Sequence, residues 1–516
     1  MRETALSLFL AAYIMHSLSL IPLIAQAQNG DTSRTAIIDA NGSYSYEQLL
    51  EASAHIALAL LNGEEDLAQE RVAFLVPSTF DYPALQWGIW RAGGIAVPLC
   101  TMHPAGELAY VIENSDASIV VAHPEYESLL RPVAEQLNRR FYLTTELQEK
   151  EVAGTLPEVD PERAAMIVYT SGTTSKPKGA VTTHNNTASQ IECLIEAWGW
   201  TPDDQILLFL PLHHVHGIVN VLCCALWAGA TCEMLPRFEA DLVWDRLKSG
   251  EVTLFMAVPT IYARLVKSWN SADDAEKQVL TEACQKLRLM VSGSAALPVS
   301  TLDEWREISG HTLLERYGMT EIGMALSNPL HGERRPGHVG SPLPGVEVRL
   351  VDEKNQQVAD GSPGEIQVRG GNVFREYWQR PEATAEAFVD GWFKTGDVAI
   401  CEDNVYRILG RNSVDIIKTG GYKVSALEIE EELRTHEAID QCAVVGVPDA
   451  EWGERVSVAV VLNDGKSLDL DTLRSWAKER LALYKVPSQL LIQEELPRNA
   501  MGKVMKPEVT KLFGGK

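Results

Sequence analysis

Short apolar runs alternate with helical stretches along most of the chain, and this alternation limits the fold more than any other feature. The runs that predict buried strands are Arg71–Val76, Gly94–Leu99, Ser118–Ala122, Gln205–Leu210, Thr253–Val258 and Leu287–Val291. A helix is expected over Pro83–Ala92, between the first two runs. Strands that alternate with helices indicate mainly parallel sheets covered on both faces. We therefore expect an α/β protein with a large N-terminal domain of stacked, mainly parallel sheets and helices.

The pattern changes after about residue 335. Val346–Asp352 and Gly364–Gly370 are short alternating strands with Gly and Pro turns, which predict an antiparallel, barrel-like subdomain. Beyond Gly410-Arg411 a compact α+β unit is expected, with helices and strands at Ala426–Thr435, Ala443–Val447, Val456–Leu462 and Asp471–Leu483. The predicted division is an N-terminal extension or first helix over 1–28, a large domain over 29–410 and a small mobile C-terminal domain over 411–516.

The N-terminus has an apolar run between Ala5 and Met15, followed by Ala25-Gln26-Ala27, in the outline of a signal peptide. Arg2 is cancelled by Glu3, however, so we expect a short extension that leads into an amphipathic helix. No later run approaches the ~20 apolar residues of a membrane span, and stable membrane insertion is not expected. Eight cysteines without zinc spacing or Cys-x-x-Cys predict free thiols. The expected compartment is the cytoplasm, with an organellar matrix as the alternative.

The overall charge excludes one class of partner. Lys and Arg number 45 and Asp and Glu 70, so the formal net charge is -25. Such a field repels nucleic acid and anionic membranes. An anion such as ATP must therefore be bound by a local group of hydrogen-bond donors and positive charges. Composition makes no prediction of the oligomeric state.

One loop has the composition expected of such an anion-binding site. After the strand-like run Ala165–Val168, the segment from Thr170 to Gly179 holds five Ser or Thr hydroxyls, two glycines and two lysines. Gly lets the backbone wrap closely around an anion, and N–H groups and hydroxyls donate hydrogen bonds to phosphate oxygens. The order of residues is not that of a Walker loop. We interpret the loop as a phosphate-binding loop.

The loop is similar to the phosphate loop of the adenylate-forming superfamily, which contains acyl-CoA synthetases, luciferases and adenylation domains. Further segments resemble that superfamily in the expected order: Arg316–Glu321, Gly391–Asp397, Gly410-Arg411 with Lys418–Val424, and Pro497–Lys503. The resemblance covers roughly residues 20 to 510. It implies an enzyme that joins a carboxylic acid to the α-phosphate of ATP and then transfers the acyl group to coenzyme A, with Mg²⁺ as cofactor.

The resemblance also implies roles for single residues in binding ATP. Glu321 is expected to hold Mg²⁺ and Thr320 to touch a phosphate. Tyr317 should stack on adenine, Asp397 should accept hydrogen bonds from the ribose hydroxyls, and Arg411 should contact ribose or phosphate. From the loop, the expected ATP-binding residues are Thr170, Ser171, Gly172, Thr173, Thr174 and Lys178.

Two lysines are expected to serve different half-reactions. The resemblance implies that Lys503 reaches the carboxylate and the α-phosphate during adenylation. The small domain then rotates, Lys503 leaves, and the segment Lys418–Val424 enters to shape the thiol tunnel. Ser413 stands where relatives usually have Asp or Lys as the hinge, and the stretch before Gly421 is one residue longer than usual. Ser413 or a neighbour is therefore the expected hinge.

Arg316 and a group of histidines indicate which acid is activated. Arg316 precedes the adenine-stacking position and could pair with a second carboxylate, and the segment 212–217 adds His213, His214 and His216. This inventory suits a short dicarboxylate, although Arg316 could equally be structural, satisfied by Glu315 or by carbonyls. The segments that resemble malonyl-CoA synthetases are Met256–Tyr262, Val291–Pro298 (with Ser294), Leu314–Met324 and Asp415–Val424.

We therefore predict that malonate is the acid and that Arg316, His214, His216 and Ser294 bind it. Methylmalonate is a plausible second substrate, because one methyl group changes the pocket energy by only ~1–3 kcal/mol. The alternatives are a ligase for short- or medium-chain monocarboxylates and a stand-alone adenylation enzyme that loads a carrier protein. A non-catalytic binding protein would be expected to lack Lys503 or Glu321, and both are present.

Overall fold

The structure is a computed structural model that describes residues 19–170, 177–420, 422–449, 452–498 and 503–514. One large sheet has seven strands. Its order is β18 (Glu376–Tyr377), β8 (Lys178–Thr183), β7 (Ala164–Thr170), β4 (Ile95–Pro98), β3 (Arg71–Leu75), β5 (Ile119–Ala122) and β6 (Arg140–Leu143). The strands from β7 to β6 are parallel, and β8 and β18 continue the sheet in antiparallel pairing.

A second large sheet has nine strands. Its order is β15 (Ser341–Pro342), β14 (Gly323–Ser327), β13 (Leu314–Met319), β12 (Leu289–Ser292), β11 (Leu254–Ala257), β9 (Gln205–Leu208), β10 (Thr231–Met234), β1 (Thr35–Asp39) and β2 (Gly42–Ser45). The pairs from β13 to β1 are parallel, and the edge pairs are antiparallel. Strands such as β5 and β11 are buried along their whole length, as expected for parallel sheets covered on both faces.

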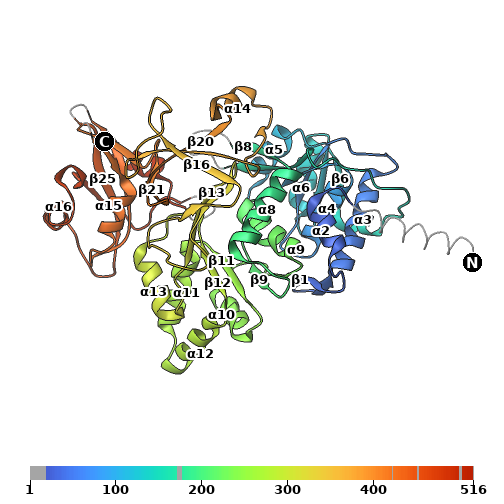
Figure 1. The fold of residues 1–516 in the computed structure, drawn as a ribbon, viewed down its shortest axis with the longest axis horizontal. Helices are drawn as coiled ribbons and strands as arrows, with labels where there is room; N and C mark the ends of the chain where they lie inside the picture. The colour runs from blue at the N-terminus through green and yellow to red at the C-terminus, as the bar shows by residue number, and fades with distance from the viewer. Residues whose placement is uncertain (1–18, 171–176, 421, 450–451, 499–502, 515–516) are drawn as a thin grey trace, which may run out of the picture.

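Helices fill the space between these sheets. Helix α3 (Tyr46–Leu61) contacts β1 and β2 and packs on α4 (Asp81–Arg91), which contacts β4 of the other sheet. Both sheets therefore share one hydrophobic core. The other helices of this part are α2 (Pro22–Asn29), α5 (Ala105–Asn114), α6 (Glu127–Gln136), α7 (Thr144–Glu149), α8 (His184–Trp198), α9 (Cys224–Ala228), α10 (Ala240–Ser249), α11 (Pro259–Ser271), α12 (Asp274–Gln285), α13 (Val299–Ser309) and α14 (Pro381–Ala387). Figure 1 shows α10 to α13 grouped below the second sheet.

The barrel-like subdomain is an antiparallel sheet of five strands. They are β16 (Val346–Val351), β17 (Gly364–Gly370), β19 (Phe388–Val389), β20 (Trp392–Glu402) and β21 (Val405–Arg411). Buried side chains of this sheet, such as Ile366 and Phe393, join the core of the two large sheets. The expected α/β fold with an added barrel-like subdomain is confirmed.

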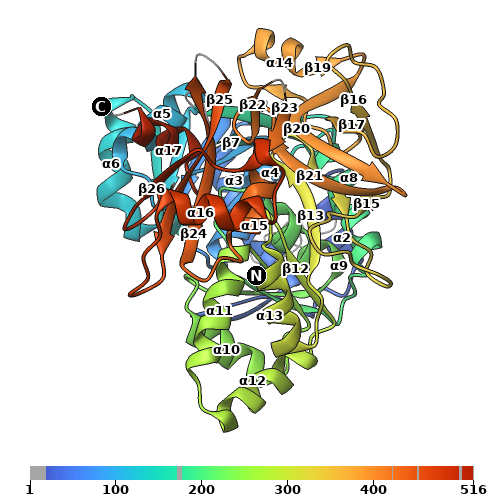
Figure 2. The same cartoon turned by 90° about the vertical axis from the view of Figure 1, so that its left-hand side faces the viewer.

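The C-terminal unit, β22 to α17, has its own sheet of β23 (Tyr422–Ser425), β22 (Ile416–Thr419), β25 (Gly453–Leu462), β24 (Ile439–Asp449) and β26 (Gln489–Ile492). Its helices are α15 (Ala426–Leu433), α16 (Leu470–Lys478) and α17 (Lys506–Phe513). Two separate apolar clusters support this sheet. The unit lies beside β21 in Figure 1 and in front of the large domain in Figure 2. The predicted division at 410 and 411 falls at the end of β21 and stays a prediction.

Two expectations differ from the structure in detail. The helix expected over Asp471–Leu483 ends at Lys478, after which the chain turns and Leu481 packs against the core of the C-terminal unit. The expected amphipathic helix near the N-terminus is α2, which buries Leu23, Ile24 and Ala27 and spans the predicted division at 28 and 29. The apolar run before residue 16 lies outside the described residues.

The structure also bears on the expected free thiols and on the expected lack of a membrane span. All eight cysteines are free, and seven of them are buried. Among the residues that the structure describes, no helix combines the length and the apolar character needed to cross a bilayer.

The packing of α3 on α4 gives a test of the fold. A Cβ on Gly88 would lie 2.6 Å from Cγ2 of Ile56 and 3.2 Å from the carbonyl oxygen of Ser53, which is backbone and yields little. Gly88→Ala should therefore lower the free energy of unfolding by about 1–3 kcal/mol, as overpacking does. In the control Gly106→Ala the new methyl group meets nothing within 4 Å. It should leave stability unchanged or raise it by up to about 1 kcal/mol. Urea unfolding of both variants measures the difference, and equal losses would contradict the packing argument.

Candidate active site

Three strands bring together the residues expected to bind adenine and ribose. Asp397 on β20 and Arg411 on β21 are register partners, and Arg411 Nε lies 3.0 Å from Asp397 Oδ1. The hydroxyl of Tyr317, on β13, donates to the other carboxylate oxygen, Asp397 Oδ2, at 2.6 Å. The carboxylate is thus held between a phenol and a guanidinium, at the place where the second large sheet meets the barrel-like subdomain.

The expected phosphate and metal residues form a second group. Thr170 and Lys178 are register partners, Thr170 at the end of β7 and Lys178 at the start of β8. They therefore stand at the two ends of the Ser/Thr/Gly-rich loop. Lys178 Nζ lies 4.5 Å from the centre of the Tyr377 ring. The Tyr377 hydroxyl donates to Glu321 Oε1 at 2.8 Å. Thr320 is half-buried in the turn before Glu321. The remaining loop residues, Ser171, Gly172, Thr173 and Thr174, lie outside the described residues.

Glu321 has an environment suited to a cation. The residue is buried, and burial raises the pKa of its carboxyl, while the Tyr377 hydrogen bond and the charges of Arg411 and Lys178 act in the opposite direction. A cation beside the carboxylate would stabilise its ionised form. Within the described ranges no group of three or more His, Cys, Asp or Glu side chains could hold a metal ion. Glu321 could supply one carboxylate to a metal ion, which suits Mg²⁺, since this ion commonly takes only one or two carboxylates beside phosphate oxygens and water.

Arg316 lies on β13 immediately before Tyr317 and is almost fully buried, at 4% exposure. Its Nε and Nη2 have no hydrogen-bond partner among the residues described. Burial lowers the pKa of Arg316 to about 10, so the guanidinium is still positively charged at neutral pH. The Gly293 backbone makes room for it, because a Cβ on Gly293 would lie 2.6 Å from Arg316 Nε and overlap the rest of the guanidinium. Buried charges are normally paired, so this site is built for an anion.

A neutral histidine, His216, lies beside the guanidinium. His216 begins the π-helix η2 (His216–Cys223), and its Nδ1 lies 3.1 Å from Ser294 Oγ. Burial lowers the pKa of His216 well below the usual range for histidine, and the positive charge of Arg316 lowers it further. Burial also lowers the pKa of His214 to about 4 and that of His213 to about 2. At neutral pH these rings are uncharged, and each can still donate one hydrogen bond to an anion from its protonated ring nitrogen.

Ser294 reaches His216 through an unusual backbone conformation. It follows the end of β12 and has φ of 69°, in the left-handed region that non-glycine residues rarely adopt. Such strain persists only where surrounding structure holds it, and it clusters at functional sites. The structure thus brings together Arg316, His216 and Ser294, and it places His214, two residues before His216, in electrostatic contact with it.

The two expected lysines both lie on the C-terminal unit. Lys418 is exposed on β22, and its backbone N–H donates to Glu454 Oε2 at 2.6 Å. Lys503 is exposed just before the bridge residue Val504, which pairs with Arg498. The other expected site residues lie on the large domain, up to the end of β21.

Two residues of the site were missed by the sequence interpretation. Tyr377 joins Lys178 to Glu321, and the sequence offered no signal, since 56 residues separate it from Glu321. Gly293 creates the space for Arg316. Its only signal was a glycine directly after a buried strand, where a close approach of another group is a common reason for glycine.

Comparison with known proteins shows the family of the chain. The pattern of the family described as AMP-binding enzyme matches residues 24–378, and that of its C-terminal domain matches residues 428–503. The chain belongs to the AMP-binding enzyme family. The mitochondrial malonate–CoA ligase of Homo sapiens is 47% identical over 93% of this chain and 90% of its own length. The malonate–CoA ligase of Arabidopsis thaliana is 41% identical over 93% of this chain and 86% of its own length.

Among solved structures, ATP-bound MatB from Rhodopseudomonas palustris superposes on this AMP-binding enzyme with a TM-score of 0.88. It is 34% identical, and the match covers 96% of this chain and 99% of that one. The predicted superfamily and fold are confirmed. The matches also support the predicted chemistry, the ATP-dependent ligation of an acid to coenzyme A through an adenylate.

Within this family member, Glu315 is directed away from its neighbour Arg316, because successive side chains of a strand point to opposite faces. Its Oε1 accepts the Gly337 N–H at 3.2 Å. Burial raises the pKa of Glu315 to about 8, and the nearby charge of Glu431 on α15 acts in the same direction. The Gly337 hydrogen bond acts in the opposite direction. The alternative in which Glu315 neutralises Arg316 is therefore not what the structure shows.

The raised pKa of Glu315 makes stability depend on pH. The folded state holds this proton more tightly than the unfolded state, so unfolding is favoured as pH rises from about 4.5 to about 8. Glu315→Gln keeps an acceptor for Gly337 and cannot ionise. The difference in the free energy of unfolding, Glu315→Gln minus parent enzyme, should therefore rise by on the order of a few kcal/mol from pH 5.5 to pH 8.5. Urea unfolding at both pH values measures the gain. The same change at the exposed Glu307 on α13 is the control, and an equal response of both variants would refute the assignment.

Proposed function

We propose that this AMP-binding enzyme is an ATP-dependent malonate–CoA ligase that forms malonyl-adenylate and then malonyl-CoA. The observation that carries the proposal is the buried guanidinium of Arg316 beside the neutral His216, with Nε and Nη2 that have no hydrogen-bond partner among the described residues. The names of the relatives from Homo sapiens and Arabidopsis thaliana support the same acid. Methylmalonate is proposed as a second substrate, since it carries the same two carboxylates and one additional methyl group.

Arg316 selects for a second carboxylate through the cost of leaving it unpaired. The distal carboxylate of malonate would neutralise the guanidinium and accept hydrogen bonds from its Nε and Nη2, and His216 Nε2 is a further buried nitrogen without a partner in the described structure. Acetate or butyrate would enter the same space and leave a buried charge uncompensated. Ser294 would act through the ring of His216, which its hydroxyl contacts.

In the first half-reaction a carboxylate oxygen of the acid attacks the α-phosphate of ATP. A bond forms between that oxygen and phosphorus, and the bond to the β-phosphate oxygen breaks, so pyrophosphate leaves. Asp397 would accept hydrogen bonds from the ribose while Tyr317 lies against the adenine, and Arg411 would contact ribose or phosphate. Lys178, Thr320, Thr170 and the hydroxyl-rich loop Ser171–Thr174 would hold the phosphates. Lys503 would stabilise the charge that develops between the acid and the α-phosphate.

Mg²⁺ would neutralise charge on the phosphates during this step. Glu321 is the residue that would hold it. Mg²⁺ commonly takes only one or two carboxylates and completes its coordination with phosphate oxygens and water, which suits a site with a single buried carboxylate.

In the second half-reaction the thiol of coenzyme A attacks the acyl carbon and AMP leaves. We propose that the C-terminal unit turns about residues 412–414, so that Lys503 withdraws and the strand of Lys418 approaches the adenylate. Both ends of this turn are anchored, since the Asn412 N–H donates to the Gly396 carbonyl at 2.9 Å and the Asp415 N–H to the Arg411 carbonyl at 2.8 Å. Ser413 is exposed between the anchors, which supports it as the pivot.

We further propose that the enzyme works in the mitochondrial matrix. The relative from Homo sapiens is named as mitochondrial, and the free cysteines suit a reducing compartment. The full chain with a fluorescent protein at its C-terminus should co-purify with the matrix fraction of mitochondria. A signal confined to the cytosol would overturn this part of the proposal.

The substrate assignment is tested with Arg316→Ala. Breaking one partner of a buried charge pair costs about 2–5 kcal/mol, so kcat/KM for malonate should fall by about 30- to 4000-fold at about 1.4 kcal/mol per tenfold. The kcat/KM for butyrate should hold or rise. Gly293→Ala should also lower kcat/KM for malonate, because its methyl group occupies the place of the guanidinium. Release of pyrophosphate in the presence of ATP and coenzyme A is the measurement, with acetate, butyrate, malonate, methylmalonate and succinate as acids.

Arg306→Ala, an exposed arginine on α13, is the matched control and should leave the selectivity unchanged. Equal rates with acetate and malonate, or unchanged malonate turnover in Arg316→Ala, would exclude malonate as the recognised acid and would make Arg316 a structural residue. Acyl transfer to a carrier protein in place of coenzyme A would exclude the ligase.

A further inference from the structure

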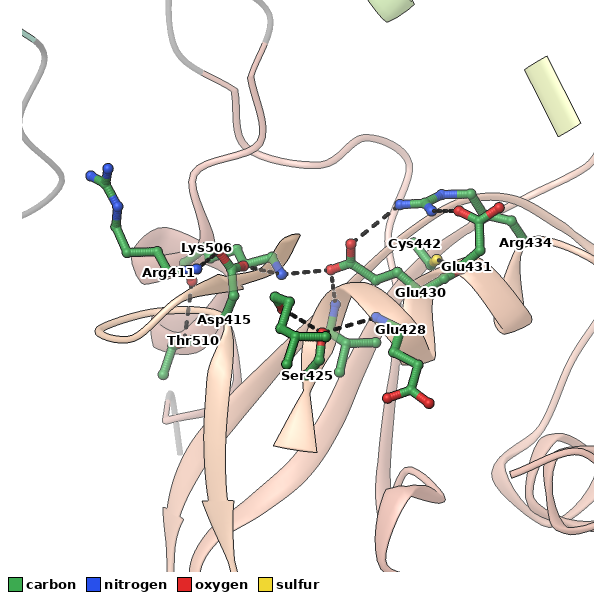
Figure 3. A network of polar contacts seen from close by, with 12 residues as sticks. Arg411, Asp415, Ser425, Glu428, Glu430, Glu431, Arg434, Cys442, Lys506 and Thr510 are labelled. Carbon is green, nitrogen blue, oxygen red and sulfur yellow. Dashed lines mark hydrogen bonds and ion pairs between the residues drawn. The ribbon is translucent and has the colours of Figure 1, made fainter. Parts of the chain in front are cut away.

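A buried lysine joins the segment that leads into the C-terminal unit to its last helix. Lys506 begins α17, and its side chain is only 12% exposed. Its Nζ lies 2.6 Å from Asp415 Oδ1 and 2.8 Å from Glu430 Oε1, and both acidic side chains are also largely buried. Figure 3 shows the three side chains converging, with Arg434 on the far side of Glu430.

This network is closely balanced in charge. Glu430 also accepts the Val444 N–H at 2.8 Å, and its other oxygen lies 3.2 Å from Arg434 Nη2. Burial alone would lower the pKa of Lys506, but the Glu430 and Asp415 carboxylates outweigh it and raise that pKa. The lysine is therefore charged at neutral pH. A buried charge with two close counter-ions holds its partners in place, because separating them would leave charges without solvent or a partner.

On one side the network reaches the proposed hinge. Asp415 Oδ2 accepts the backbone N–H of Arg411 at 3.0 Å, and the Asp415 carbonyl accepts the Ala426 N–H at 2.8 Å. Gly410, with φ of 125°, permits this approach, since a side chain there would collide with Asp415. Arg411 in turn contacts Asp397 through its guanidinium. The carboxylate that Lys506 holds is thus bonded to the residue at the start of the turn.

On the other side the network reaches Lys503, three residues earlier in the chain. Val504 bridges to Arg498, and the Met505 N–H donates to the Pro497 carbonyl at 2.8 Å. Lys506 follows at once and starts a helix with proline in its first turn. The chain that carries Lys503 is therefore clamped immediately after it, and the Lys506 ammonium ties that clamp to Asp415 and Glu430.

We infer that Lys506 is a positioning residue for adenylation, which fixes the Lys503 segment to the hinge through Asp415 and Glu430. The inference rests on the proposed function. If the Lys503 segment moves as one body with the hinge, each orientation of the C-terminal unit places the Lys503 ammonium at one defined point. Without the tie, the segment would vary in position relative to Asp415, and an error of about 1 Å in a reacting group can cost on the order of 100-fold in rate.

The two half-reactions separate this role from a general contribution to stability. In Lys506→Met, malonate-dependent exchange between ATP and pyrophosphate should fall by on the order of 100-fold. Formation of malonyl-CoA from synthetic malonyl-adenylate and coenzyme A, which does not use Lys503, should stay within about threefold of the parent rate. Lys506→Arg can still meet both carboxylates and should recover most of the exchange activity.

Lys485→Met is the matched control. Lys485 forms a comparable ion pair within the same unit, to Glu428 on α15 at 2.5 Å, and among the described residues this pair includes neither the hinge nor the Lys503 segment. It should leave both half-reactions unchanged. If Lys506→Met does not fold, Asp415→Asn cuts the tie at the hinge, keeps the Glu430 pair, and should show the same split between half-reactions.

A proportional loss of both half-reactions, or an unchanged exchange rate in Lys506→Met and Asp415→Asn, would overturn the inference. The parent enzyme separates this failure from failure of the proposed function. If the parent shows no exchange with malonate but exchanges with another acid, the substrate assignment fails, and the same variants then test Lys506 with that acid.

Discussion

The guanidinium of Arg316 is the feature on which the substrate side of the site depends. Burying a positive charge without a partner is costly, and Nε and Nη2 of Arg316 have no hydrogen-bond partner in the part of the chain that the structure describes. Gly293 yields the space of a side chain, Ser294 adopts a strained backbone beside it, and His216 remains uncharged. The strand itself directs Glu315 to the opposite face. Each feature makes sense if the missing counter-charge arrives with the acid, since binding energy is then obtained only from an acid that carries a second carboxylate.

Strand β13 also sets the distance between the two reactants. Arg316 and Tyr317 are consecutive, so their side chains leave opposite faces of one strand, and only Tyr317 reaches Asp397. Glu321 follows in the turn that leads to β14. Under the proposed function, a short acid whose distal carboxylate pairs with Arg316 would have its reacting carboxylate close to the strand that positions the nucleotide. A long acyl chain would have to displace the guanidinium, which explains how one residue can define both the charge and the length of the acid.

Much of the fold could be predicted because local signals and tertiary structure agree. The apolar runs at β3, β5, β9 and β11 were placed within a few residues of their observed bounds, since strands buried on both faces are continuous in sequence. Contacts between distant segments could not be predicted. The hydrogen bond of Tyr377 to Glu321 joins β18 of one large sheet to the turn after β13 of the other. The approach of Gly293 to Arg316 follows from the pairing of β12 with β13. The choice between a structural and a substrate-binding Arg316 likewise needed the geometry, because sequence adjacency of Glu315 suggested a pair that strand alternation forbids.

The C-terminal unit poses a mechanical requirement that the large domain does not. Under the proposed mechanism one short turn, at residues 412–414, must present Lys503 in one orientation and Lys418 in the other. A single rotation can serve both only if the two lysines belong to one rigid body. Lys418 lies on a sheet strand, which is rigid by pairing, whereas Lys503 lies next to Val504, which forms an isolated bridge with Arg498. The segment that carries Lys503 needs its own connection to the hinge, and the buried contacts of Lys506 with Asp415 and Glu430 supply one.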